Sequence, residues 1–146
     1  MTALRIDPVS EADLPDLRTL QLEFSRSIGE AEPDGDAFDR IAAAIEAGQI
    51  HFMLAREGDR PVGTCSLTIG FSTYGAAPFG VFDDFYVVPD RRKTGLARRL
   101  VDAVLAAARE RGCRSVLGGV SDGDVEMWKH FGFRKIGNMM ATDLPG

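Results

Sequence analysis

Hydrophobic residues recur along the chain at helical and at strand spacing, and together the two patterns predict ten elements. Apolar residues three and four positions apart predict helices over 14–28, 37–47 and 96–108, stopped by Gly29, Gly48 and Gly112. A shorter helix is predicted from Asp124 to about Phe131. Alternating or continuous apolar runs bounded by Gly or Pro predict strands at 4–9, broken at Pro8, and at 51–56, 61–71, 81–88, 115–120 and 134–142.

The order of these elements is β-α-α-β-β-β-α-β-α-β, which predicts an α/β (α+β) fold class. We expect a single mixed, mostly antiparallel sheet flanked by helices. A length of 146 residues, with no repeat and no evident linker, predicts one domain over residues 1–146. The stretch 72–80 is rich in Gly and small residues and predicts a loop.

Charge is distributed unevenly along this mildly acidic chain. The formal net charge is −5, yet residues 91–114 alone carry a net +6, so the rest carries −11. An acidic surface argues against broad binding to nucleic acid or to an anionic membrane, and we expect neither partner. A basic-loop RNA binder is a remote alternative, since interleaved aromatic residues are lacking. Residues 91–114 instead indicate a small, local anion site.

The sequence also bears on compartment and metal binding. The N-terminal residues lack a signal-peptide pattern and no stretch approaches eighteen apolar residues, so we predict a cytoplasmic protein that does not span a membrane. Cys65 and Cys113 stand alone, without the spacing of metal ligands, and are predicted to be reduced. Asp122-Gly123-Asp124 resembles the start of a calcium loop, but the twelfth position is Phe133 and not Glu. No metal site is therefore predicted.

The segment FDDFYVVPDRRKTGLARRL (82–100) carries the clearest chemical signal. A strand that enters a helix through a basic, glycine-containing turn presents backbone N–H groups and the positive end of the helix dipole to an anion. Gly95 allows a ligand close to the backbone, while Arg92 and Lys93 add full charges. Lys93-Thr94-Gly95 does not fit a Walker loop, and no GxGxxG is present. The pattern predicts a phosphate site of another kind.

This segment resembles the acetyl-CoA signature of the GNAT N-acetyltransferase superfamily. In that family a strand ending in Val-x-Pro is followed by Arg/Gln-x-x-Gly-x-Gly/Ala; this chain has Val87-Val88-Pro89 and then Arg92 to Ala97. The resemblance covers nearly the whole chain, least securely residues 1–50, and implies that acetyl-CoA is bound. The residues that it implies for this binding are Phe85, Val87, Val88, Arg92, Lys93, Thr94, Gly95, Leu96, Ala97, Arg98, Ser121 and Trp128.

The resemblance further implies what parts of acetyl-CoA these residues contact. The pantetheine arm would pair with the strand backbone around Phe85, Tyr86 and Val87, and the pyrophosphate would lie on the loop backbone from Arg92 or Lys93 through Arg98. The segment Ser121–Asp124 would also contact the cofactor, although many family members begin it with Asn where this chain has Ser121.

Asp83 and Asp84 are candidates for the general base. Acetyl transfer needs a neutral amine, and a carboxylate near the reacting sulfur can remove the ammonium proton. Strand alternation predicts that the two side chains lie on opposite faces, so that one faces the acceptor; the sequence does not say which. An acidic pair stands at this place in the polyamine-acetylating branch of the family. The alternative is that neither is catalytic and one caps or pairs structurally.

A second departure concerns protonation of the leaving thiolate. Many family members use a Tyr four residues before a Gly-aromatic pair, where this chain has Trp128, and an indole N–H is too weak an acid. Tyr86 or Tyr74 could substitute, the thiolate could leave unaided, or activity could be reduced. Trp128 would then be a packing or pocket-wall residue.

Residues 1–50 hold eleven acids and four bases, which bears on the acceptor. Glu30, Glu32, Asp34 and Asp36 cluster between the first two helices. They indicate either a cationic acceptor such as a polyamine or, as we favour, a solvated acidic loop.

Taken with the family resemblance, these residues lead us to predict acetyl transfer from acetyl-CoA to a primary amine of a small molecule. The amine would attack directly in a ternary complex, with the carbonyl polarised by a backbone N–H near Val87.

The alternative class is a catalytically weak acyl-CoA-binding sensor or partner module. Ser121 and Trp128 are the departures that favour it. The resemblance also suggests a homodimer.

Overall fold

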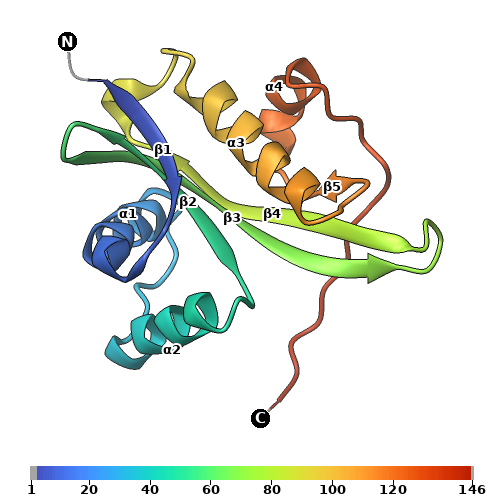
Figure 1. The fold of residues 1–146 in the computed structure, drawn as a ribbon, viewed down its shortest axis with the longest axis horizontal. Helices are drawn as coiled ribbons and strands as arrows, with labels where there is room; N and C mark the ends of the chain where they lie inside the picture. Colours follow the sequence, from blue (N-terminus) through green and yellow to red (C-terminus); the bar gives the residue numbers. More distant parts are fainter. Residues whose placement is uncertain (1–2, 146) are drawn as a thin grey trace.

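A computed structural model describes residues 3–145, in which four helices cover the two faces of one five-stranded sheet (Figure 1). The sheet order is β1-β2-β3-β4-β5; β1 to β4 are antiparallel neighbours, and β5 is parallel to β4. The helices α1 and α2 lie on one face, and α3 and α4 on the other (Figure 1). The strands are β1 (Leu4–Pro8), β2 (His51–Glu57), β3 (Arg60–Ser72), β4 (Ala77–Val87) and β5 (Val116–Leu117), and the helices α1 (Leu14–Ser27), α2 (Gly35–Glu46), α3 (Leu96–Glu110) and α4 (Val125–His130). The predicted mixed α/β fold class is confirmed.

Helix ends and buried faces follow the local sequence. Asp34 caps α2 by accepting a hydrogen bond from the Ala37 N–H at 2.7 Å. Gly112, at a φ of +80°, follows the end of α3 in the left-handed conformation that glycine adopts without strain. The buried face of α3 repeats at helical spacing through Leu96, Leu100, Val101, Val104 and Ala108. Burial of this face holds α3 on the sheet.

From residue 72 onward, the observed strands differ from the predicted ones in three places. The predicted loop at 72–80 is largely strand, because β3 and β4 stay paired up to Ser72 and Ala77. The fifth strand has two residues instead of the predicted 115–120, and the predicted last strand at 134–142 is wrong, since residues 134–145 contain neither helix nor strand. A strand needs a neighbour to take its backbone hydrogen bonds. Beyond Val81 and Leu117 the two last strands no longer pair, and the described part of the chain offers the C-terminal residues no partner there.

Two remaining expectations concern cysteines and membrane spans, and an arginine with two acidic partners joins two elements. Cys65 and Cys113 are free thiols. Arg56 of β2 pairs with Asp13, at 2.7 Å, and with Asp16, which ties this strand to the start of α1. Among residues 3–145, no helix combines the length and the apolarity needed to cross a membrane.

Candidate functional site

A β-bulge interrupts β4 at the acidic pair. Thr64 pairs with Tyr86 and Ser66 with Asp83, so Asp84 and Phe85 stand together opposite Cys65. Asp84 has a φ of +52°, a conformation that Asp adopts more readily than most side chains. The Asp83 carboxylate accepts a hydrogen bond from the Asp84 N–H at 2.8 Å, which supports this turn of the backbone. The strand is therefore irregular at the acidic pair, so alternation alone does not fix the directions of the two carboxylates.

Asp84 lines a pocket between the α1 and α2 helices and the sheet, which we name the α1–α2 pocket. Its volume is about 430 Å³, within the range of small-molecule sites. Asp83 is exposed and does not line it. The lining residues come from α1, α2, β2, β4 and the segment before β2, and are Gln21, Ala37, Arg40, Ile41, Ala44, Ile50, Phe52 and Asp84.

Burial and two neighbours set the acidity of Asp84. The side chain is half-buried, and this loss of solvent raises its pKa above the ordinary range. The Ser66 hydroxyl donates a hydrogen bond to the Asp84 carboxylate at 2.8 Å and lowers the pKa, whereas the charge of Asp83 raises it. The net shift is upward, which makes the ionised carboxylate a stronger base than an exposed aspartate.

Gln21 and Arg40 add two polar groups to the same pocket. The Gln21 Oε1 atom is buried and has no hydrogen-bond partner among the described residues. A buried oxygen without a donor is unusual and costs free energy, so a ligand that donates to it would be stabilised there. The Arg40 side chain also lines the pocket; it is 68% exposed, and its Nη2 lies 3.6 Å from Asp34 Oδ1.

The edge of β4 that faces away from β3 presents unpaired backbone groups. The β5 strand pairs only with Gly80 and Val81, so the outer edge of β4 beyond Val81 has no neighbouring strand within residues 3–145. The Val88 N–H donates to Val62 of β3, and alternation along the strand therefore directs the Val87 peptide groups toward the open edge. Arg92 confirms this direction, since its Nε donates to the Val87 carbonyl oxygen at 3.1 Å.

The basic segment, residues 92–98, continues from this edge into α3. Lys93 and Gly95 have left-handed backbones, with φ of +62° and +89°, and Gly95 forms the N-cap of α3 without any side-chain cap. Within the described residues, no acceptor is found for the first N–H groups of the helix at Leu96, Ala97 and Arg98. Open space surrounds the position that a Cβ on Gly95 would occupy. The segment has the donors, dipole and access that an anion requires.

The positive charges around this segment have different partners. Arg91 pairs with Glu57 and with Asp90, and Arg60 holds the same Asp90 at 2.7 Å. The hydrogen bond from Arg60 lowers the pKa of Asp90 to about 2, so this group of charges persists across the physiological range. Arg98 lies 3.4 Å from Asp102. Arg91 therefore connects the start of the loop to β2, whereas Arg92 and Lys93 have no acidic partner within residues 3–145.

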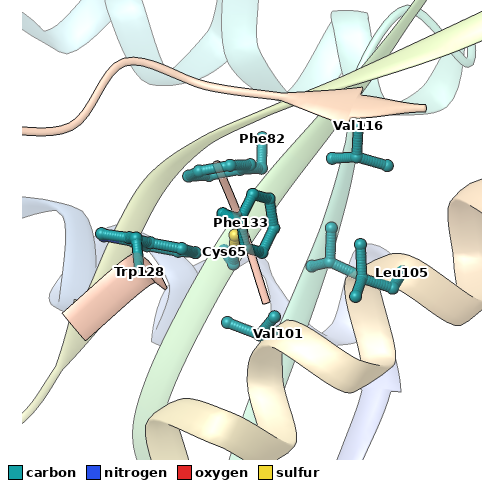
Figure 2. A pocket seen from close by; sticks show the side chains of 8 residues that line it. Cys65, Phe82, Val101, Leu105, Val116, Trp128 and Phe133 are labelled. Atoms are coloured by element: carbon teal, nitrogen blue, oxygen red, sulfur yellow. The ribbon is translucent and has the colours of Figure 1, made fainter. Parts of the chain in front are cut away.

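Trp128 lies in an aromatic cluster between α3, α4 and the sheet (Figure 2). It is 6% exposed, stacks on Phe82 with ring centres 4.5 Å apart and meets Phe85 edge-on at 5.2 Å. The cluster leaves a cavity of about 10 Å³, at the lower limit for a single water, and its lining is almost entirely apolar. Cys65 lines this cavity, and burial raises its pKa to about 12, so its thiol does not ionise at neutral pH.

The remaining predicted residues lie apart from Trp128. Tyr86 packs against Phe24 of α1 and its hydroxyl lies 3.3 Å from Glu23, so its ring is on the α1 side of β4. Tyr74 is fully exposed in the turn between β3 and β4, which projects from the body of the molecule (Figure 1). The Ser121 hydroxyl donates to Asp124 at 2.7 Å at the entry to α4.

Three polar residues of the site were not predicted from the sequence: Gln21, Arg40 and Ser66. Gln21 and Arg40 belong to helices whose polar positions carry no motif, and only the fold brings them to Asp84. Ser66 is 1% exposed in the apolar run of β3. A lone hydroxyl in such a run is the one available signal, because a buried polar group needs a partner.

Comparisons with known proteins agree with this arrangement. An acetyltransferase of Trypanosoma brucei is 26% identical, with a TM-score of 0.79 over 97% of this chain and 100% of that one. A predicted acetyltransferase from Clostridium acetobutylicum, solved with acetyl-CoA, is 17% identical, with a TM-score of 0.80 over 97% of this chain and 96% of that one. The glucosamine-6-phosphate N-acetyltransferase of Arabidopsis thaliana is 16% identical, with a TM-score of 0.81 over 98% of this chain and 99% of that one. The last two show the fold alone.

The sequence itself supplies the decisive match. No curated protein matches the chain. The model of the family described as acetyltransferase (GNAT) family matches residues 14–133, which include the bulge, the open strand edge, the basic segment and Trp128. The chain belongs to the GNAT acetyltransferase family.

Proposed function

We propose that the protein is a cytoplasmic N-acetyltransferase that transfers the acetyl group of acetyl-CoA to a primary amine of a small molecule. The amine attacks directly in a ternary complex, with Asp84 as general base. The observation that carries this proposal is the α1–α2 pocket, which is lined both by Asp84, a half-buried carboxylate at the bulge of β4, and by Gln21, whose amide oxygen is buried without a partner among the described residues. Family membership supports acetyl transfer from acetyl-CoA in general.

The residues present fit acetyl-CoA. Unsatisfied N–H groups at the start of α3 and the open space over Gly95 suit a pyrophosphate, and the open edge of β4 suits the amides of a pantetheine arm. Bound acetyl-CoA would supply a thioester at whose carbonyl carbon the new C–N bond forms as the C–S bond breaks. We assign three groups of residues to acetyl-CoA binding: the basic segment, the strand edge at Phe85, Val87 and Val88, and the side chains of Ser121 and Trp128.

Asp84 and Gln21 would act together on the acceptor. An ammonium group is a triple donor, so it can bond to the Asp84 carboxylate and to Gln21 Oε1 at once. Asp84 then takes one ammonium proton and frees the nitrogen lone pair for attack. Gln21 keeps hold of a second N–H and so fixes the direction of the lone pair. The Val87 N–H, directed to the open edge, is the donor that would polarise the acetyl carbonyl.

The remaining proton passes from the acetylated nitrogen to the departing sulfur. Tyr86 is the nearest candidate in sequence to assist, and its place on the α1 side puts it on the same side as Asp84. Unaided departure is the alternative, since a thiol is a fair leaving group. A covalent relay through Cys65 is disfavoured, because its thiol is buried with a pKa of about 12. Direct transfer needs no such relay.

The competing function is an acyl-CoA-binding module with little catalysis, favoured by Trp128 at the place where many relatives carry an acidic Tyr. Calorimetry with acetyl-CoA is expected to show binding under both functions. A thiol-release assay with acetyl-CoA and a panel of small amines separates them. We expect release that depends on the amine and saturates with it. Binding of acetyl-CoA without amine-dependent release from any amine would overturn the proposed enzyme.

A further inference from the structure

The α1–α2 pocket contains charges of both signs, and their positions differ. Asp84 is half-buried, whereas the Arg40 side chain on α2 is 68% exposed, and both residues line the same pocket. Much of the remaining lining is apolar, with Ile41, Ile50 and Phe52. A ligand that satisfies the whole pocket needs a cation at the inner end, a hydrocarbon body, and an anion at the outer end.

The acidic residues between α1 and α2 lie outside the lining of the pocket, although Asp34 forms an ion pair with Arg40 at 3.6 Å. None of Glu30, Glu32, Asp34 and Asp36 is among the residues that line the pocket. Glu32 is paired with Arg26 at 2.6 Å, and Asp34 caps α2. Among residues 3–145, Asp84 is thus the one carboxylate in the lining, and a second ammonium on the acceptor would meet Arg40 instead of an acid. These contacts support the solvated-loop interpretation of the cluster over attraction of a polycation.

Arg40 retains donors for a ligand. Its nearest acidic oxygen, Asp34 Oδ1, is 3.6 Å away, beyond hydrogen-bond length, and that oxygen already accepts from the Ala37 N–H. A guanidinium offers five N–H donors in a plane and binds a carboxylate through two parallel hydrogen bonds. The same charge repels a cationic group at the far end of a ligand, so Arg40 favours anionic ligands and disfavours cationic ones.

We propose that the acceptor is a primary amine with an apolar body and a carboxylate or similar anion at its far end, read by Arg40. This inference rests on the proposed acetyl transfer and specifies its substrate class. Arg40 is a specificity-determining residue in this view, while Asp84 and Gln21 hold the reacting nitrogen.

Three probes with the same hydrocarbon chain test the inference: ω-aminohexanoate, hexylamine and α,ω-diaminohexane. They share the reacting amine and differ in the far group, which is anionic, neutral or cationic. We expect kcat/KM to fall in that order, by about 2- to 5-fold at each step, the range for ion pairs as exposed as Arg40. The Arg40→Glu variant is expected to reverse the order. Arg5→Glu, which changes the same charge at an exposed position of β1 outside the pocket, is expected to preserve it.

Thermal melting and circular dichroism establish that each variant is folded before its rates are compared. Equal rates for the three probes, a preference for diaminohexane in the unchanged protein, or an order that Arg40→Glu leaves unaltered would overturn the inference. If no probe is acetylated, calorimetry in the presence of CoA still decides. Arg40-dependent binding of aminohexanoate would then retain the ligand class while the proposed activity fails, and no binding would reject both.

Discussion

The two sides of β4 form their parts of the site by different means. On the cofactor side, the donors are backbone N–H groups at the strand edge and at the start of α3, within residues 85–98. On the acceptor side, the polar groups are the side chains of Gln21, Arg40, Ser66 and Asp84, which come from four separate elements. The first set is contiguous in sequence and the second is assembled by the fold.

This difference predicts how each side responds to mutation. A backbone donor survives most side-chain changes and is lost only when the backbone conformation changes. A side-chain group is removed by a single substitution while the fold remains. The acceptor side should therefore be sensitive to conservative side-chain exchanges, and the cofactor side to changes at its left-handed glycine.

The largest expected effect is at the base. Replacing Asp84→Asn removes the proton acceptor but keeps the size of the side chain and an oxygen for the Ser66 hydroxyl. We expect kcat to fall by about 10²–10⁴-fold, the usual contribution of a general base, with little change in acetyl-CoA binding. The same exchange removes a carboxylate whose pKa burial raises, so the melting temperature at neutral pH should not fall.

Asp83→Asn is the matched control for this experiment. Asp83 is exposed, lies outside the pocket lining and bonds the Asp84 N–H, a bond that an Asn oxygen can also accept. A kcat within about threefold of the unchanged protein is expected, well below the loss of a general base. If kcat falls as much or more in Asp83→Asn, the base is Asp83 and not Asp84, and the description of the acceptor side given above is wrong.

On the cofactor side, Gly95→Val tests the backbone. The φ of +89° is strained for valine by about 1–2 kcal/mol, and relief of that strain would redirect the first N–H groups of α3. Since hydrogen bonds from such groups to a charged ligand are worth about 1.5–3 kcal/mol each, acetyl-CoA affinity measured by calorimetry should fall by about 10- to 100-fold.

Gly112→Val supplies the control at the other end of α3. Gly112 has a φ of +80° and, like Gly95, open space where a Cβ would lie. The two variants should lose similar unfolding free energy, while only Gly95→Val loses acetyl-CoA affinity. If both bind acetyl-CoA equally well, the anion contacts are made by the side chains of Arg92 and Lys93, and the contrast between the two sides fails.

The cofactor side could be predicted from the sequence because its chemistry depends on local conformation. Val-Val-Pro, a basic turn and Gly95 at a helix start specify the exposed N–H groups by themselves. The order of elements predicted the fold class for the same reason, since each helix and paired strand carries its own periodicity. The last predicted strand at 134–142 was wrong because apolar spacing cannot supply the neighbouring strand that pairing needs.

The acceptor side could not be predicted in the same way. Asp84 was a candidate, but alternation assumed a regular strand, and the bulge that turns this side chain into the pocket depends on the pairing of β4 with β3. Gln21, Arg40 and Ser66 are ordinary residues in their own segments. Their meaning comes from contacts between elements far apart in the chain, which a single sequence does not show.

Gln21→Leu tests the amide oxygen, with a smaller effect. It removes the unpartnered Oε1 atom and replaces it with a side chain of similar volume. If Gln21 holds the acceptor amine, KM for the amine should rise by about 2- to 10-fold, equivalent to the net value of one hydrogen bond, while KM for acetyl-CoA stays constant. Gln49→Leu, at an exposed position after α2, is expected to change neither. An unchanged amine KM in Gln21→Leu would remove Gln21 from the acceptor site.

The smallest and most specific effect is expected from Ser66→Ala. The Ser66 hydroxyl lowers the Asp84 pKa by donating to its carboxylate, so without it the pKa rises further above the ordinary value. Since Asp84 must be ionised to accept a proton, the acidic limb of kcat/KM against pH should move to higher pH. The pH dependence of stability has the same sign. A carboxyl whose pKa is raised in the folded state adds to the free energy of unfolding below its ordinary pKa, and this contribution is lost as pH rises through the folded-state pKa. Ser66→Ala should therefore lose unfolding free energy mainly at neutral pH. Thr64→Val is the control: it removes a neighbouring buried hydroxyl that donates to the Met53 carbonyl, and the acidic limb should stay in place. A limb that moves in both variants, or in neither, would show that the Ser66 hydroxyl does not set the pKa of Asp84.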